Sequence, residues 1–192
     1  MLSEKQFRER SRSELQHIGR QVQAMAADRD VYWKFEREIV EPNPQLKNGR
    51  SVFLDMLRGS YVEAMLARVL RLLQPGECEV SLPRIVEQLT QYPDLLHDRL
   101  TQREFADDRE ALQEAVVRVK RATVPRAAHH ERTLSALACA HRELDVALDL
   151  LLALTKTYYW IVADSYLDLE VGHGDDPMAV FQFAWALPSL AR

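Results

Sequence analysis

Hydrophobic positions along this chain recur at intervals of three and four residues, the spacing of one face of an α-helix. A first helix is predicted from Ser3, a suitable N-cap, to about Ala27. Its apolar stripe consists of Leu15, Ile18, Val22 and Met25. A second stripe, Tyr32, Phe35 and Ile39, continues or follows it, up to the sequence Glu41-Pro42-Asn43-Pro44. Proline ends a helix because it lacks the N–H donor, so a loop is predicted to run to Gly49.

The segment from Ser51 to Gln74 is apolar around most of a helical circumference, which predicts a helix in the middle of a bundle. Ser81 is expected to cap the next helix, which Pro93 ends. Residues 100–108 are predicted to be irregular, and Asp107 or Asp108 to cap a helix with the buried face Leu112, Ala115, Val116 and Val119. A long helix is expected from about Thr133 to Leu167. Asp176-Pro177 predicts a short final helix with Phe181 and Trp185.

No segment alternates with a strict period of two, and neither an internal repeat nor a βαβ alternation is present. The chain has 192 residues, 47% of them hydrophobic and 28% charged, with few glycines and prolines. These values are typical of one globular domain rich in helix-forming residues. The sequence therefore predicts an all-α helical bundle of four to five main helices over residues 1–192, with a short C-terminal helix.

Charge and cysteine content bear on the compartment and the partners. The net charge of −4 gives no overall attraction to nucleic acid or anionic membrane, so such binding would need a local patch. The distant cysteines, Cys78 and Cys139, favour two free thiols over one disulfide. The N-terminus lacks the apolar stretch of a signal peptide. The most apolar segment, Val146–Ala163, contains Asp149 and Lys156, which favours a buried helix over a membrane span. We expect a cytoplasmic protein with no membrane partner.

Sequence motifs for nucleotide, zinc or calcium binding and for serine hydrolases are absent. No cofactor and no metal are therefore expected. One weaker metal hypothesis remains, in which a divalent ion is held by carboxylates near the C-terminus together with His173. The set consists of Asp164, Asp168, Glu170, His173, Asp175 and Asp176. Such a run is more often a solvated helix end.

The clearest local charge lies between Arg118 and Thr133, in the sequence RVKRATVPRAAHHERT. Its basic residues, opposed only by Glu131, are Arg118, Lys120, Arg121, Arg126 and Arg132. If Pro125 lies in the first turn of a helix, then Arg126, His129 and His130 project from one face.

This combination suits cleavage of a phosphodiester. Histidine transfers protons near neutral pH, and arginine can hold a phosphate through two parallel hydrogen bonds. RNA supplies its own nucleophile, the 2′-hydroxyl, so no metal is required. The structural alternative is that Arg118, Lys120 and Arg121 are charges at a helix C-terminus, where the helix dipole favours them. His129 and His130 would then be surface histidines.

Several short segments, in this order, resemble the HEPN superfamily, and within it the branch named after abortive-infection (Abi) phage-defence proteins. The resemblance covers most of the chain. It rests on Tyr32-Trp33 with Asn43-Pro44, Leu66–Leu70, Ser81–Val86, Ala128-His129 after a basic stretch, Glu143–Asp149 and Tyr158-Tyr159.

The resemblance implies a helical homodimer that cleaves RNA without metal, as a toxin or in phage defence. It further implies a cognate antitoxin or nucleotidyltransferase as a possible partner. The family motif is Arg, four to six residues, then His. Here seven residues separate Arg121 from His129, and two separate Arg126 from it. Either Pro125 bulges the backbone and restores the geometry, or the chain is a descendant without catalysis.

On the catalytic hypothesis, His129 is the general acid and base, with His130 as the alternate. Arg121 and Arg126 would hold the scissile phosphate, and Arg118, Lys120 and Arg132 would bind RNA. The rival hypothesis is a non-catalytic helical interaction or oligomerisation module. A metal-dependent bundle enzyme ranks third.

Overall fold

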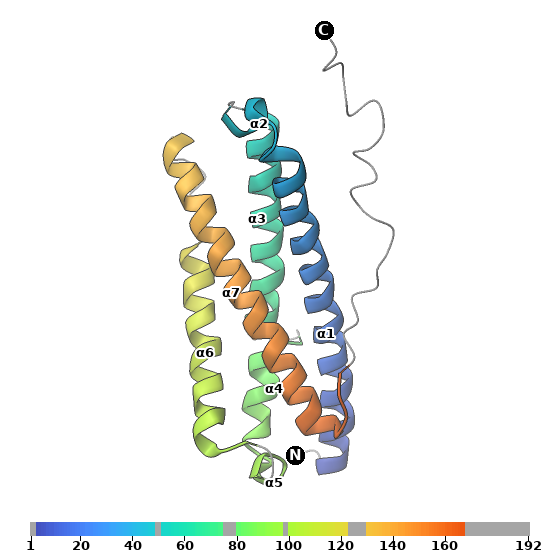
Figure 1. The fold of residues 1–192 in the computed structure, drawn as a ribbon. Helices are drawn as coiled ribbons and strands as arrows, with labels where there is room; N and C mark the ends of the chain where they lie inside the picture. Colours follow the sequence, from blue (N-terminus) through green and yellow to red (C-terminus); the bar gives the residue numbers. More distant parts are fainter. Residues whose placement is uncertain (1–2, 49–50, 75–79, 98–99, 123–129, 168–192) are drawn as a thin grey trace.

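The structure, a computed structural model, describes residues 3–48, 51–74, 80–97, 100–122 and 130–167; the side chains of 47, 48, 97 and 130–138 are not described. Four long helices lie side by side, and short helices cover the two ends (Figure 1). In order, the elements are α1 (Glu4–Phe35), η1 (Glu36–Val40), α2 (Pro44–Asn48), α3 (Val52–Leu73), α4 (Leu82–Leu89), α5 (Pro93–His97), α6 (Gln102–Arg121) and α7 (His130–Ala163). No strand occurs in these ranges, so the predicted all-α bundle is confirmed.

Helix α1 begins as predicted. The Ser3 hydroxyl accepts from the Gln6 backbone N–H, and the Gln6 side chain accepts from the Ser3 N–H, which forms a capping box. The predicted stripe of Leu15, Ile18, Val22 and Met25 is fully buried. The second stripe continues the same helix, which passes into the π-helical turn η1, where Glu41 N–H donates to the Glu36 carbonyl across five residues (2.9 Å). The expected loop after Val40 contains a further short helix, α2.

Helix α3 has the predicted bounds, but its predicted position in the middle of the bundle is wrong. The central helix is α7, which contacts α1, α3, α4, α5 and α6. At the start of α3 the side chains of Val52, Phe53 and Met56 are exposed. A helix that is apolar on most sides need not be surrounded by its own chain, because solvent-exposed apolar residues are common on protein surfaces.

Two expectations between α3 and α7 are also wrong. Pro93 does not end α4, which stops at Leu89; it begins the short helix α5. Residues 100–108 are not irregular, because α6 begins at Gln102 and not after Asp107 or Asp108. The reason is a capping box in which Thr101 and Glu104 satisfy each other's backbone N–H groups.

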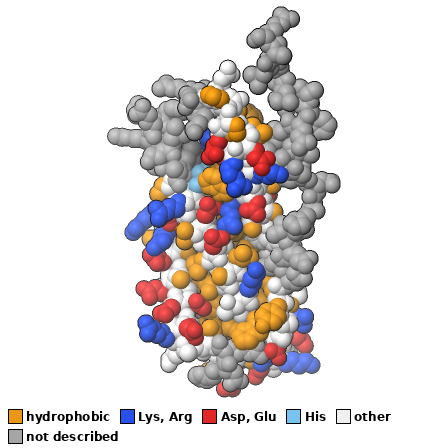
Figure 2. All heavy atoms as spheres, viewed as in Figure 1, with side chains coloured by type: hydrophobic (Ala, Val, Ile, Leu, Met, Phe, Trp, Pro, Cys, Tyr) orange, Lys and Arg blue, Asp and Glu red, His pale blue; other side chains and the backbone are white. Residues whose placement is uncertain are grey.

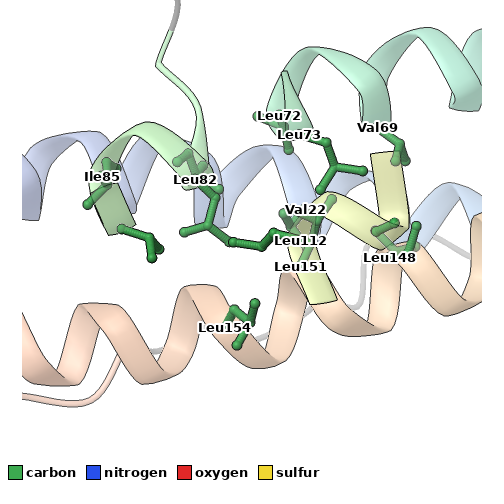
Figure 3. Close-up of a cluster of buried hydrophobic side chains, with 14 of the residues drawn as sticks. Val22, Val69, Leu72, Leu73, Leu82, Ile85, Leu112, Leu148, Leu151 and Leu154 are labelled. Carbon is green, nitrogen blue, oxygen red and sulfur yellow. The ribbon is translucent and has the colours of Figure 1, made fainter. Parts of the chain in front are cut away.

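Helix α7 runs antiparallel to α1 and supplies the largest share of the core (Figure 1). Figure 3 shows its side chains meeting those of α1, α3, α4 and α6. The segment Cys139–Ala163 is long and apolar enough to cross a membrane, and half of its most apolar window is buried within the bundle. Core packing accounts for this apolarity, as expected from the sequence. The predicted final helix after Asp176 lies outside the described residues.

Candidate functional site

The predicted basic segment lies where α6 ends and α7 begins, and we call residues 118–132 the α6–α7 junction. Arg118, Lys120 and Arg121 occupy the last turn of α6, and all three are exposed. His130 is the first residue of α7, and Arg132 follows in its first turn; their side chains are not described. Arg126 and His129 lie outside the described residues. The structure thus places the two ends of this segment on consecutive helices and leaves its predicted catalytic contacts untested.

Charges along α6 are separated by sign. Basic side chains gather over the C-terminal end of α6, and acidic side chains lie lower on the same helix (Figure 2). The Arg118 guanidinium donates to Glu114 Oε1 over 2.7 Å, within a fully exposed pair. Exposed pairs of this kind are easily exchanged for another anion, because water screens them. The basic end of α6 is therefore available to a phosphate.

A second concentration of polar groups is buried between α1, α3 and α7. We call it the Glu36 network, and it consists of Tyr32, Glu36, Arg58, Tyr61 and His141. Arg58 donates to both carboxylate oxygens of Glu36, Nε to Oε1 and Nη2 to Oε2, each over 2.7 Å. Bidentate pairs of this geometry are among the stronger charge-assisted hydrogen bonds. Glu36 is 8% exposed, so the pair is largely shielded from water.

The Tyr32 hydroxyl connects Glu36 to His141. It donates to Glu36 Oε1 over 3.0 Å and lies 3.1 Å from Nε2 of His141. Because the hydroxyl has one proton and gives it to Glu36, its oxygen accepts from His141, which places the imidazole proton on Nε2. The rings of Tyr32, Tyr61 and His141 are close to parallel, with centroids 4.0 Å apart for Tyr32–Tyr61 and 4.8 Å for Tyr32–His141.

Burial and charge shift the pKa values of this network in opposite directions. Burial lowers the pKa of His141, although the Glu36 carboxylate acts the other way. Burial alone would raise the pKa of Glu36, but the hydrogen bonds and charge of Arg58 outweigh it and lower that pKa. Burial raises the pKa of Tyr61 to about 12 and raises the pKa of Tyr32 further. At neutral pH the network therefore contains an ionised Glu36 and a neutral His141.

The network favours a structural role. His141 is 8% exposed and its Nε2 is already bonded, so a substrate has little access to the imidazole. Its contacts instead join Glu36 after α1, Arg58 on α3 and His141 on α7. Buried polar groups with satisfied hydrogen bonds fix one arrangement of the elements that carry them.

This chain matches no protein-family model, and no curated protein or solved structure is significantly similar to it. The resemblance to the HEPN superfamily therefore stays a prediction that rests on the residues quoted above.

Sequence reasoning missed two features. The Arg–four to six residues–His spacing does occur within α1, where Arg12 and Arg10 precede His17 by four and six intervening residues. In the structure Arg12 donates to the Tyr159 hydroxyl, Arg10 pairs with Glu14, and His17 is 2.6 Å from the side-chain amide of Gln21. All three residues are exposed on one unbroken helix.

The second missed feature is the Glu36 network. Its signals in the sequence are Tyr32 and Glu36 at i, i+4, and Arg58 as a charge within an apolar helix. These signals do not show that His141 completes the set.

No group of three or more His, Cys, Asp or Glu residues is placed to hold a metal ion among the residues searched. Of the acidic C-terminal set considered for a metal, the described part of the chain includes only Asp164, which is exposed. Cys139 is an exposed free thiol, and Cys78 lies outside the described residues.

Proposed function

We propose that this chain is a HEPN-like helical protein that acts as a homodimer and cleaves RNA without metal at the α6–α7 junction. The observation that carries the proposal is the exposed basic end of α6, which directly precedes the two histidines in the sequence. Basic side chains at a helix end supply the electrostatic contact that single-stranded RNA needs. The all-α architecture agrees with what the resemblance implies.

In the proposed reaction His129, with His130 as the alternate, removes the proton of a 2′-hydroxyl and returns a proton to the leaving 5′-oxygen. The 2′-oxygen forms a bond to phosphorus as the bond to the 5′-oxygen breaks, which gives a cyclic phosphate. Arg121 and Arg126 hold the phosphate oxygens and stabilise the charge that develops on them. Arg118, Lys120 and Arg132 contact the neighbouring backbone phosphates. In a cell such an activity would require control by an antitoxin or a nucleotidyltransferase partner.

The test uses the full-length protein in EDTA with single-stranded RNA. The double variant His129→Ala/His130→Ala should lose about 100-fold or more of the cleavage rate, the usual contribution of a general acid and base. The control is His17→Ala, because α1 also carries the Arg–His spacing; it should cleave at the wild-type rate.

Three outcomes contradict the proposal in different ways. Cleavage that survives in the double variant removes the assignment of the histidines. Loss of cleavage in His17→Ala alone moves the site to α1. Absence of cleavage by the wild-type protein, with an unchanged circular dichroism spectrum, leaves the non-catalytic alternative.

That alternative, an interaction or oligomerisation module, has its own observation. Val52, Phe53 and Met56 form an exposed apolar strip on the first turns of α3, with Phe53 62% and Met56 59% exposed. Apolar side chains that gather on one helix face mark surfaces for protein partners. On this hypothesis Phe53→Ser/Met56→Ser should weaken self-association in sedimentation equilibrium and leave the urea unfolding midpoint unchanged. Unchanged self-association would remove the strip as the interface.

A further inference from the structure

A shallow apolar groove lies between the C-terminal half of α1 and the middle of α3. It has a volume of about 320 Å³. Its lining consists of Asp28, Val31, Tyr32, Phe35, Leu57, Tyr61, Ala64, Met65 and Arg68. The two charged members, Asp28 and Arg68, form an ion pair with each other. The lining therefore offers a ligand an apolar floor and little unpaired charge.

Two other surface grooves have a more polar lining. The groove between α3, α4 and α6 includes Glu87, Arg109 and Gln113. The groove at the α5 end of the bundle includes Thr90, Thr101 and Gln102. Among the described surfaces, the α1–α3 groove thus suits an apolar occupant best.

The same chain contains such an occupant beyond α7. Nine of the ten residues from Met178 to Leu187, MAVFQFAWAL, are apolar, with Gln182 as the exception. The sequence predicts a helix here, in which Met178, Phe181 and Trp185 at i, i+3 and i+7 form one face. An apolar helix face laid into a groove is a common mode of recognition. A ten-residue segment with this composition gains free energy by leaving water.

The connecting segment is long enough to reach the groove. The Tyr159 hydroxyl accepts from Arg12 and Gln16, so the end of α7 lies beside the first half of α1. From Gln16 to Asp28 and Phe35 the rise along α1 is about 18 to 28 Å. Residues 168–177 span up to ~33 Å when extended. The C-terminal segment can therefore run along α1 and reach the groove from below.

Charge also favours this path. The connecting segment carries Asp168, Glu170, Asp175 and Asp176 and has no lysine or arginine. Between Glu4 and Arg20, α1 carries five basic residues and three acidic ones. The path thus leads an acidic segment along a basic stretch of helix, an arrangement that electrostatics favours.

We propose that residues Met178–Leu187 of this chain occupy the α1–α3 groove in the same molecule. The proposal does not depend on RNA cleavage. It leaves the apolar strip of Val52, Phe53 and Met56 free, because the groove begins one turn further along α3, at Leu57.

The test is cross-linking of cysteine pairs in the full-length protein. In a Cys78→Ser/Cys139→Ser background, Val31→Cys is combined with Ala184→Cys and treated with a short bismaleimide at low protein concentration. The matched control is Val117→Cys with Ala184→Cys, because Val117 is also a half-exposed valine, on α6. We expect the Val31 pair to form a cross-linked monomer at least tenfold faster than the control pair. A second groove position, Ala64→Cys, should behave like Val31→Cys.

Three results would overturn the proposal, provided that circular dichroism shows a folded protein. Equal rates for the groove and control pairs mean that the segment has no preferred site. Cross-linked dimers as the main product mean that a second copy occupies the groove. Absence of a cross-link at both Val31 and Ala64 means that the segment binds elsewhere. If one groove variant does not fold, the other decides.

Discussion

The Glu36 network and the α6–α7 junction both combine arginine with histidine, yet they differ in exposure. In the network, Arg58 and Glu36 are bonded through two short hydrogen bonds, and His141 is enclosed by aromatic rings. At the junction, the arginines of α6 are exposed. The same side chains therefore stabilise a fold where water is excluded and become available to a ligand where it is not. Residue type alone does not distinguish the two roles; burial and existing partners do.

The largest expected effect separates the two regions by stability. Replacing Glu36 with Ala leaves the half-buried Arg58 charge and the Tyr32 hydroxyl without their acceptor. We expect the free energy of unfolding to fall by about 3 kcal/mol, the lower end of the range for breaking a buried ion pair, because Arg58 retains some contact with water. Urea unfolding followed by circular dichroism measures this change.

The matched control is Glu114→Ala, which removes the acceptor of Arg118 on the surface of α6. The urea midpoint should stay at the wild-type value, because water replaces the lost partner. Equal destabilisation by Glu36→Ala and Glu114→Ala would mean that the network is not the anchor described above.

The next effect concerns pH and His141. Its pKa is lowered in the folded state, so the unfolded state binds more protons below about pH 6.5. Stability is therefore full above that pH and decreases as the pH falls, by at most about 1.4 kcal/mol between pH 7.5 and 5.5. Glu36, whose pKa is also lowered, stays ionised over this interval and loses its contribution only at more acidic pH.

Urea unfolding at pH 7.5 and 5.5 measures this dependence. His141→Phe keeps a stacked ring but cannot take up a proton, so its pH dependence should be weaker than that of the wild-type protein. His17→Gln, at an exposed position on α1, should behave as wild type. If His141→Phe shows the full wild-type dependence, another group is responsible.

The smallest effect concerns the junction and depends on salt. Arg121→Gln should reduce the slope of log affinity for single-stranded RNA against log salt concentration by about 0.7, the value for one phosphate contact. Arg103→Gln is the control, since Arg103 is an exposed arginine at the opposite end of α6. Binding isotherms at several salt concentrations give both slopes. Equal reductions for the two variants would mean that RNA contact is not confined to the junction.

The helices were largely predictable from the sequence because local spacing encodes them. The stripe in α1 and the bounds of α3 follow from periodicity and capping residues. The start of α6 was mispredicted although its signal, Thr101 followed three residues later by Glu104, is present in the sequence. Several aspartates at 107 and 108 offered an alternative cap, and the local pattern alone did not rank the two.

The Glu36 network was not predictable in the same way, because its members are distant in sequence. Glu36 and Arg58 are 22 positions apart, and Tyr32 and His141 are 109 apart. Only the packing of α1, α3 and α7 brings them together. The position of α3 was mispredicted for a related reason, since a count of apolar residues does not show which neighbours cover them. The predicted catalytic contacts at the junction stay predictions.

The wide turn of η1 has a consequence for insertions and deletions. A π-helical turn contains one residue more than a regular α-helical turn. Deleting one residue between Glu36 and Val40 would let α1 continue as a regular helix and would rotate all that follows by about 100°. Val40, now buried with Phe35 and Leu54, would then point away from them. Homologues that lack this residue should therefore carry a polar side chain where Val40 lies here, together with a redesigned chain reversal before α3.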